Sequence, residues 1–257
     1  MAAKRRNRRR RRGRASFPLR LLSLIIVIAA IVGALTMFFR IDTIVVQGNA
    51  RYTDEQIIEA AGVRKEQNLV LLNKYNVKQA IFDALPYVET VVINRKYPDA
   101  LLLTVTECEA SAALSGADGT WLMSDSGKIL ERTAKIPQDC VRVTGCELAE
   151  PSVGAPAAFS NEESYKLERL LTLLRAAEEK QLLSMIGEVD LSDGTGITLT
   201  YLGRFTVKMP WDADLAYKLE NLRTVVDVLE NNETGEINYM LLKSKGEMHF
   251  IPSAPGA

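Results

Sequence analysis

The stretch LLSLIIVIAAIVGALTMFF, residues 21–39, decides how this 257-residue chain is organised, because its 19 residues carry no charge. At about 1.5 Å of rise per helical residue, it matches the roughly 30 Å hydrocarbon core of a bilayer. We therefore expect a single transmembrane helix over residues 21–39. The residues expected to span the membrane include Leu21, Ile25, Ile28, Val32, Leu35 and Phe39.

The chain is strongly basic before this stretch and acidic after it. Eleven of the 32 Lys and Arg residues lie at or before Arg40, whereas all 32 Asp and Glu residues follow it, so the remainder carries a formal charge of −11. Basic flanks stay on the cytoplasmic side of a membrane. We therefore expect residues 1–20 to form a cytoplasmic tail, and the chain after Arg40 to lie outside the cell membrane.

Two other interpretations of the N-terminus are open. Val32-Gly33-Ala34 loosely resembles a cleavage site, but the apolar run continues past it, and a signal-peptide core is typically about 7–15 residues long. The arginine run could bind nucleic acid, but no aromatic residue before Phe17 offers base stacking. An acidic external domain is also unsuited to phosphate backbones, so we expect no nucleic-acid partner.

Residues 41–109 show the pattern of a small domain with the order β-α-α-β-β. Thr53 and Gln56 form a capping box at the start of the first helix, and Gly62 ends that helix. Pro86 ends the second helix. Two helices on one face of a sheet would bury the apolar stripes. The five elements are expected at Ile41–Asn49, Thr53–Ala61, Asn76–Leu85, Val88–Arg95 and Leu101–Glu107.

Residues 110–251 are richer in strands and carry two helical patterns, near 161–179 and 213–230. The second pattern has apolar residues at 4-3-4-3 spacing, which permits a coiled coil but covers barely two heptads, so packing on a sheet is favoured. Residues 252–257 are expected to be a disordered tail. The strands are expected near residues 111–114, 120–123, 128–130, 141–144, 186–191, 197–201, 205–209, 237–242 and 248–251.

The expected fold class is therefore α+β. It comprises a single N-terminal transmembrane helix, a β-α-α-β-β domain and a larger mixed β-sheet domain with helices on one face.

The sequence offers little for catalysis. His249 is the only histidine, which removes most metal sites and most nucleophile–base pairs. Glu107 and Glu109 are the nearest local acid pair, and two carboxylates could in principle hydrolyse a glycoside, but nothing near them would raise a pKa. We expect no enzyme, no cofactor, no metal and no small-molecule substrate.

Three cysteines, Cys108, Cys140 and Cys146, are too few and too odd in number for a disulfide scaffold. We expect all three to be buried free thiols, while a link from Cys108 to either of the others stays open.

An ordered series of short matches in residues 41–113 resembles one known family. The matching pieces are Ile44-x-Val46-x-Gly48-Asn49, Tyr52-Thr53, Gly62, Asn68-Leu69, Pro86-Tyr87-Val88, Val92-x-x-Arg95, Pro98-Asp99-Ala100-Leu101 and Val105-Thr106-Glu107. They resemble the POTRA segment of the FtsQ/DivIB bacterial cell-division proteins. Weaker matches in the second domain are Trp121–Lys128, Lys218-Leu219, Leu222, Ile237-Asn238 and Phe250-Ile251-Pro252. After Glu107 the family usually has a Pro before the next strand, whereas this chain reads Cys108-Glu109-Ala110-Ser111. At Asn238 the family usually has Asp.

This resemblance implies a bitopic scaffold of the cell membrane and division septum, which binds FtsL-like and FtsB/DivIC-like proteins and helps organise septal wall synthesis. The alternative is a POTRA-type chaperone or translocation module that binds extended clients.

An exposed terminal strand can accept a partner segment by β-augmentation, so the hypothesis for the docking edge is the closing hairpin. Alternation along a strand would place about half of its residues in the core. The expected partner-binding residues are Ile237, Tyr239, Met240, Leu241, Met248 and Phe250.

Overall fold

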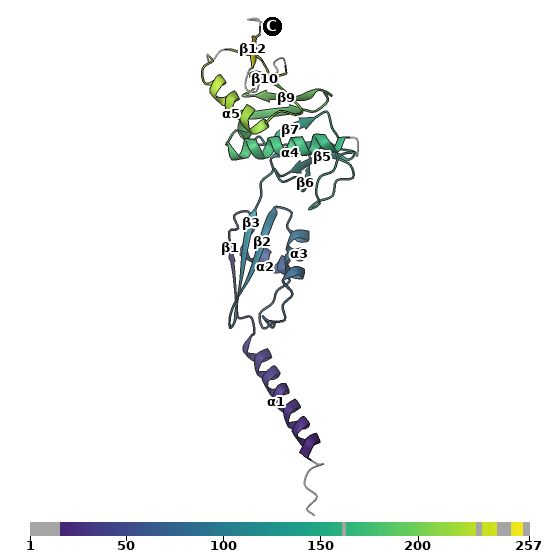
Figure 1. Ribbon diagram of the computed structural model, residues 1–257, viewed down its shortest axis with the longest axis vertical. Coiled ribbons are helices and arrows are strands. Elements are labelled where there is room, and N and C mark those ends of the chain that lie inside the picture. The colour runs from purple at the N-terminus through teal and green to yellow at the C-terminus, as the bar shows by residue number, and fades with distance from the viewer. Residues whose placement is uncertain (1–15, 161–162, 230–232, 241–247, 254–257) are drawn as a thin grey trace, which may run out of the picture. The chain divides into compact units, whose positions relative to one another are not determined.

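The computed structural model describes residues 16–160, 163–229, 233–240 and 248–253. The chain divides into two compact units. The first comprises Met1–Lys78 and Val91–Thr104, and the second comprises Gln79–Thr90 and Val105–Ala257. The expected α+β class is confirmed (Figure 1).

Helix α1 spans Ser16–Phe38 and is long and apolar enough over Arg20–Phe38 to cross a membrane. Consecutive side chains from Leu24 to Ile28 are all more than half exposed, so the helix presents apolar groups on every side and has no buried face between Arg20 and Phe38. A helix that is apolar all round needs an apolar surrounding. The helix ends at Phe38, so Phe39 lies one residue beyond it.

The first unit contains the predicted β-α-α-β-β order, with the boundary between the units passing through α3, β2 and β3. The sheet order is β1-β3-β2, and β1 pairs with β3 in parallel. Thr53 Oγ1 accepts a hydrogen bond from the Gln56 amide at 3.3 Å, and Gln56 Oε1 accepts one from the Thr53 amide at 2.9 Å, so the predicted capping box is present. The elements are β1 Thr43–Gln47, α2 Asp54–Ala61, α3 Lys74–Ala84, β2 Val88–Lys96 and β3 Ala100–Glu107.

The second unit is built on a nine-stranded mixed sheet with the order β12-β11-β10-β9-β8-β7-β4-β5-β6. The pairs β10/β11, β7/β8 and β4/β7 are parallel, and the other pairs are antiparallel. The strands are β4 Ala112–Gly116, β5 Gly119–Met123, β6 Ile129–Thr133, β7 Val141–Thr144, β8 Ile186–Asp190, β9 Gly196–Tyr201, β10 Phe205–Pro210, β11 Gly235–Asn238 and β12 His249–Pro252.

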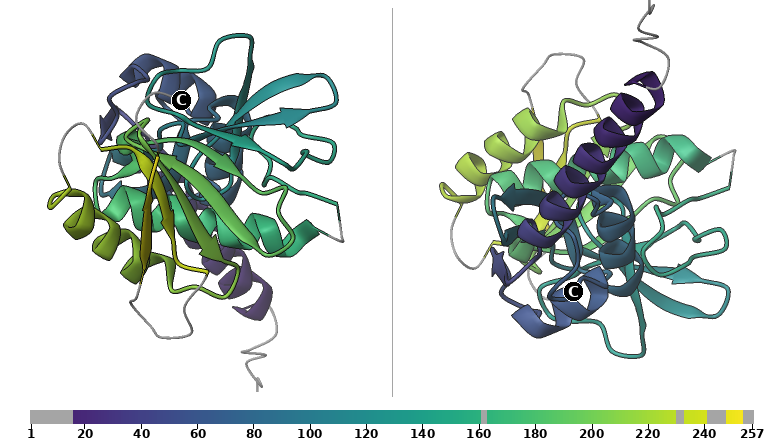
Figure 2. Two further views of the ribbon diagram at one scale, coloured as in Figure 1. Left: turned by 90° about the horizontal axis from the view of Figure 1, so that it is seen from above. Right: turned by 90° about the horizontal axis from the view of Figure 1, so that it is seen from below.

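Two helices, α4 Ser164–Glu179 and α5 Leu215–Val226, cover one face of this sheet, and the left view of Figure 2 shows strands passing in front of α4. Leu170 of α4 and Leu219 and Leu222 of α5 are fully buried in the core that the strands complete. The apolar stripe of α5 therefore packs within its own unit, as the sequence predicted. The short 3-10 helix η2, Leu183–Met185, leads from α4 into β8.

The terminal hairpin forms, but its ends differ from the prediction. β11 ends at Asn238, because the Asn238 side chain accepts a hydrogen bond from the Met240 amide at 2.8 Å and closes a local turn there. β12 continues to Pro252, and the Ser253 amide donates to the Thr234 carbonyl at 2.9 Å, so the predicted tail at 252 begins too early. Leu241 and residues 254–257 lie outside the described residues.

Candidate protein-protein interface

β12 is the last strand of the nine-stranded sheet, and it pairs with β11 on one side only among the described residues. Edge strands present a row of backbone N–H and C=O groups that can pair with another chain. The order of strands therefore places the predicted docking hairpin at a free edge of the sheet.

The register of β12 identifies which backbone groups face outward. The Ser253 amide donates to the Thr234 carbonyl, and bonded pairs alternate with non-bonded pairs along an antiparallel ladder. Ile251, two residues earlier, therefore faces β11 with its backbone groups, whereas Phe250 directs its N–H and C=O away from β11. Pro252, two residues after Phe250, also directs its backbone away from β11, so its missing N–H removes no hydrogen bond of the ladder.

Two of the six predicted partner-binding residues lie in the core. Ile237 is 0% exposed and Tyr239 is 2% exposed. The Tyr239 hydroxyl donates to the Lys218 carbonyl at 3.4 Å, the Lys218 ammonium lies 4.5 Å from the Tyr239 ring centre, and burial raises the pKa of Tyr239 to about 12. Tyr239 thereby holds the hairpin onto α5, and Ile237 belongs to the same core, so neither is a surface anchor.

Three of the predicted residues lie closer to the surface, and the sixth is Leu241. Phe250 is half-buried and meets Phe205 edge to face at 6.1 Å between ring centres. Met248 is partly buried against the same core, and Met240 is half-buried beyond the end of β11.

Ile251 is an exposed apolar residue of the edge that the sequence prediction missed. It is 47% exposed, on the face of β12 opposite to Phe250. The alternation of His249-Phe250-Ile251 could have found it, because a strand that turns Phe250 inward must turn its neighbours outward. His249 is exposed.

An ion pair supports the edge on the open face of the sheet. Lys208 Nζ of β10 lies 2.8 Å from Glu236 Oε2 of β11, and Asn238 Nδ2 donates to Glu236 Oε1 at 2.7 Å. These two hydrogen bonds, the one from Lys208 foremost, lower the pKa of Glu236 below its ordinary value. The ion pair thereby fixes β11, the strand that pairs with β12, to β10.

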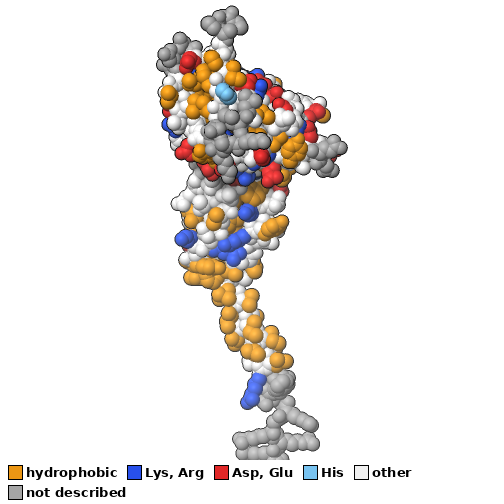
Figure 3. All heavy atoms as spheres, turned by 45° about the horizontal axis from the view of Figure 1, so that its top comes forward, with side chains coloured by type: hydrophobic (Ala, Val, Ile, Leu, Met, Phe, Trp, Pro, Cys, Tyr) orange, Lys and Arg blue, Asp and Glu red, His pale blue; other side chains and the backbone are white. Residues whose placement is uncertain are grey.

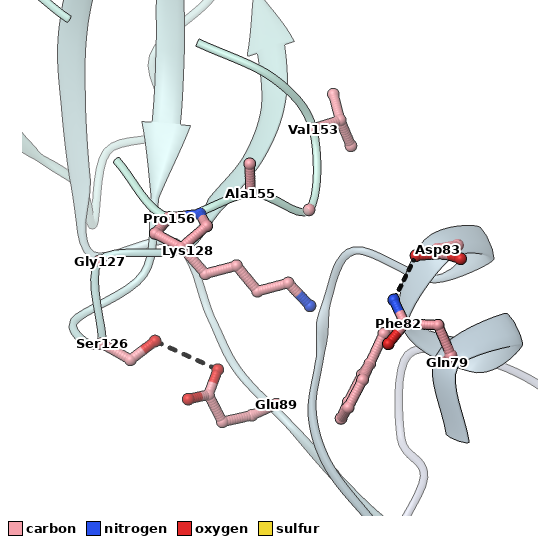
Figure 4. A pocket seen from close by; sticks show the side chains of 11 residues that line it. Gln79, Phe82, Asp83, Glu89, Ser126, Gly127, Lys128, Val153, Ala155 and Pro156 are labelled. Atoms are coloured by element: carbon pink, nitrogen blue, oxygen red, sulfur yellow. Dashed lines mark hydrogen bonds between the residues drawn. The ribbon is translucent and has the colours of Figure 1, made fainter. Parts of the chain in front are cut away.

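A separate pocket of about 550 Å³ lies within the second unit (Figure 4). The Lys128 side chain extends through it, and its ammonium donates to the Val88 carbonyl at 2.9 Å and lies 5.3 Å from the Phe82 ring centre. Ser126 donates to Glu89 at 3.2 Å. Burial lowers the pKa of Lys128. Lys128 and Glu89 thus join the start of β2 to the β5–β6 turn.

The cysteines are free thiols, and only Cys140 is fully buried, while Cys108 and Cys146 are half-buried. Burial raises the pKa of Cys108 to about 11 and that of Cys146 to about 12. Among the described residues, no group of three or more His, Cys, Asp or Glu side chains is placed to hold a metal ion.

Comparison with known proteins agrees with this architecture. Residues 39–107 match the FtsQ-type POTRA domain. The cell division protein FtsQ of Corynebacterium glutamicum is 26% identical over 182 residues, which covers 69% of this chain and 76% of that protein. Cell division protein DivIB is 24% identical over 197 residues in Clostridium botulinum (76% of this chain, 74% of that protein) and 24% identical over 210 residues in Clostridium tetani (81% and 78%).

The FtsQ/DivIB family is non-enzymatic. An N-terminal apolar helix, an FtsQ-type POTRA region and a mixed sheet domain accompany a similarity to the FtsQ and DivIB cell-division proteins that extends over most of the chain.

Proposed function

We propose that this protein is a bitopic scaffold of the division machinery, with its basic tail in the cytoplasm, α1 in the cell membrane and the chain after Arg40 outside, at the division septum. The exposed apolar surface of α1 and the basic flank before it support this topology. The names of its relatives support the role in division.

The scaffold binds an extended segment of an FtsB/DivIC-like partner along β12, with an FtsL-like protein as the further partner of the assembly. One observation carries this proposal: β12 ends the sheet, and the backbone N–H and C=O of Phe250 point outward from it. A partner strand added there would gain main-chain hydrogen bonds from these groups and side-chain contacts from Ile251.

The test compares two substitutions of one residue. Phe250→Ala and Phe250→Pro both remove the ring that packs on Phe205, but only Pro also removes the outward N–H. A hydrogen bond contributes about 0.5–1.5 kcal/mol net, so the Pro variant is expected to bind the purified partner ectodomain about two- to twelvefold more weakly than the Ala variant. Affinity is measured with the full chain in nanodiscs.

Phe250 is a better position for this test than Tyr239. The Tyr239 amide donates to the Lys208 carbonyl at 2.9 Å inside the sheet, so Pro at Tyr239 would damage the pairing of β10 with β11. Equal affinities of the Phe250→Ala and Phe250→Pro variants, both folded by circular dichroism, would show that the partner does not use this edge.

A matched pair of charge substitutions separates the scaffold from the POTRA-type chaperone. Ile251 on β12 and Val92 on β2 are exposed apolar residues, 47% and 52%, and both strands are sheet edges. Ile251→Asp is expected to weaken partner binding at least tenfold, whereas Val92→Asp is expected to leave the affinity for the partner unchanged. Binding of extended peptides that Val92→Asp alone abolishes would favour the chaperone function.

Location in the cell tests the septal part of the proposal. A fluorescent protein fused before Met1 is expected to form a band at midcell that appears with constriction. Even fluorescence around every cell would contradict the septal role.

A further inference from the structure

The turn between α2 and α3 carries two neighbouring apolar side chains that point into solvent. Leu71 is 75% exposed and Val70 is 45% exposed. Asn68 Oδ1 accepts hydrogen bonds from the amides of both residues, at 2.9 Å from Val70 and 3.0 Å from Leu71. The turn is therefore pinned in a conformation that holds these two residues, hereafter the apolar tip, at the surface.

Hydrogen bonds join the same turn to the end of α1. The Leu69 amide donates to the Phe39 carbonyl at 2.8 Å, and Asn68 Nδ2 donates to the Thr36 carbonyl at 3.3 Å. Thr36 lies inside the apolar stretch, two residues before the end of the helix. At about 1.5 Å of rise per residue, Thr36 belongs to the last turn of α1, so the Asn68 side chain lies level with that end of the helix. The apolar tip, Val70 and Leu71, comes two residues after Asn68 in the chain.

Aromatic and basic side chains surround this junction. The Phe39 ring meets Phe38 and Tyr97 edge to face, at 5.3 and 5.4 Å between ring centres, and Tyr97 is 58% exposed. Arg40 and Lys96 are exposed nearby in sequence to these rings. Figure 3 shows hydrophobic side chains gathered where α1 meets the rest of the first unit, with Lys and Arg side chains beyond them. Aromatic belts and basic residues of this kind are typical of the membrane–water interface.

We propose that the apolar tip inserts into the outer surface of the bilayer beside α1, so that the part of the first unit after α1 rests on lipid instead of turning freely about the end of that helix. The proposal rests on the proposed function, because it requires α1 to span the membrane. The occupant is lipid because the apolar surface of the tip continues that of a helix that already needs an apolar surrounding.

The experiment places Trp at three positions in the full chain, reconstituted into vesicles of phosphatidylcholine brominated on its acyl chains, which quenches Trp fluorescence on contact. Leu71→Trp probes the tip, Ile28→Trp probes the middle of α1, and Val92→Trp is the control on β2. Val92 is exposed like the tip, but it lies about 13 Å along the strand from Lys96. The unsubstituted chain gives the signal of Trp121 and Trp211.

Strong quenching of Ile28→Trp and Leu71→Trp, with no added quenching of Val92→Trp, is the expected result. Adding Val70→Asp to the Leu71→Trp chain should reduce quenching at the tip and leave it unchanged at Ile28. If Ile28→Trp is quenched while Leu71→Trp behaves like Val92→Trp, the proposed lipid contact is wrong and the anchor stands. Absence of quenching at Ile28 would overturn the membrane anchor itself.

Discussion

At the scale of single residues, Gly235 shows how closely β12 is fitted to the sheet. A Cβ at this position would overlap the Ile251 carbonyl oxygen and crowd the Phe250 ring. The edge strand can therefore pair with β11 only because residue 235 has no side chain.

Gly235→Ala is expected to destabilise the protein by about 1–3 kcal/mol, as overpacking does, and to weaken partner binding. Gly187→Ala in β8 is the matched control, because a Cβ there meets nothing within 4 Å. Urea unfolding measures both variants. Equal stability of the two variants would contradict the close fit of β12.

The raised pKa values of the thiols give a second prediction at this scale. Because burial raises the pKa of Cys108 to about 11 and that of Cys146 to about 12, few thiolates exist near neutral pH, and thiolate is the reactive form. Reaction with a thiol reagent at pH 8 is expected to be slow in the folded chain and complete within seconds in denaturant. Rapid reaction of both folded thiols would contradict their burial.

The raised pKa values of these thiols also set the direction in which the free energy of unfolding changes with pH. Because the pKa of each thiol is higher in the folded state, the protonated thiols contribute to the stability of the fold below the ordinary value of 9.0. This contribution is lost as the pH rises through about 11 to 12. The stability difference between the wild type and Cys146→Ala, from urea unfolding at pH 8 and pH 10.5, should therefore shrink at the higher pH. A difference that grows would contradict the direction of the shift.

At the scale of elements, α5 decides between packing and coiled-coil assembly. Its stripe is buried within the second unit, and Leu222 is fully buried, whereas Val228 just beyond the helix is 82% exposed. Leu222→Ala is expected to cost about 2–5 kcal/mol of unfolding free energy and Val228→Ala less than about 0.5 kcal/mol, with no change in oligomeric state for either. A change of oligomeric state with Leu222→Ala would favour a coiled coil.

Local chemistry made most elements predictable. The capping box at Thr53 and the left-handed Gly62, with φ of 62°, set both ends of α2, and alternation found the strands of both sheets. The parallel pairing of β10 with β11 was not predictable, because the partner of a parallel strand is set by a long connection instead of a local turn. The burial of Ile237 and Tyr239 was not predictable either, because strand alternation alone does not say which face meets the helices.

At the scale of the whole molecule, the order of the parts supports the proposed extracytoplasmic module held at a membrane. A basic tail precedes an exposed apolar helix, a POTRA region follows it, and the acidic remainder ends in a sheet with a free edge. The FtsQ/DivIB family is non-enzymatic, so the proposed scaffold role depends on a binding surface, and the proposed surface is the β12 edge.

Amide hydrogen exchange of β12 in the full chain, with and without the partner ectodomain, tests this claim most directly. In the free protein the Ile251 amide should exchange slowly, because it faces β11, and the Phe250 amide should exchange fast. Binding is expected to protect Phe250. A bound partner that leaves the Phe250 amide exchanging as fast as before would contradict docking at this edge.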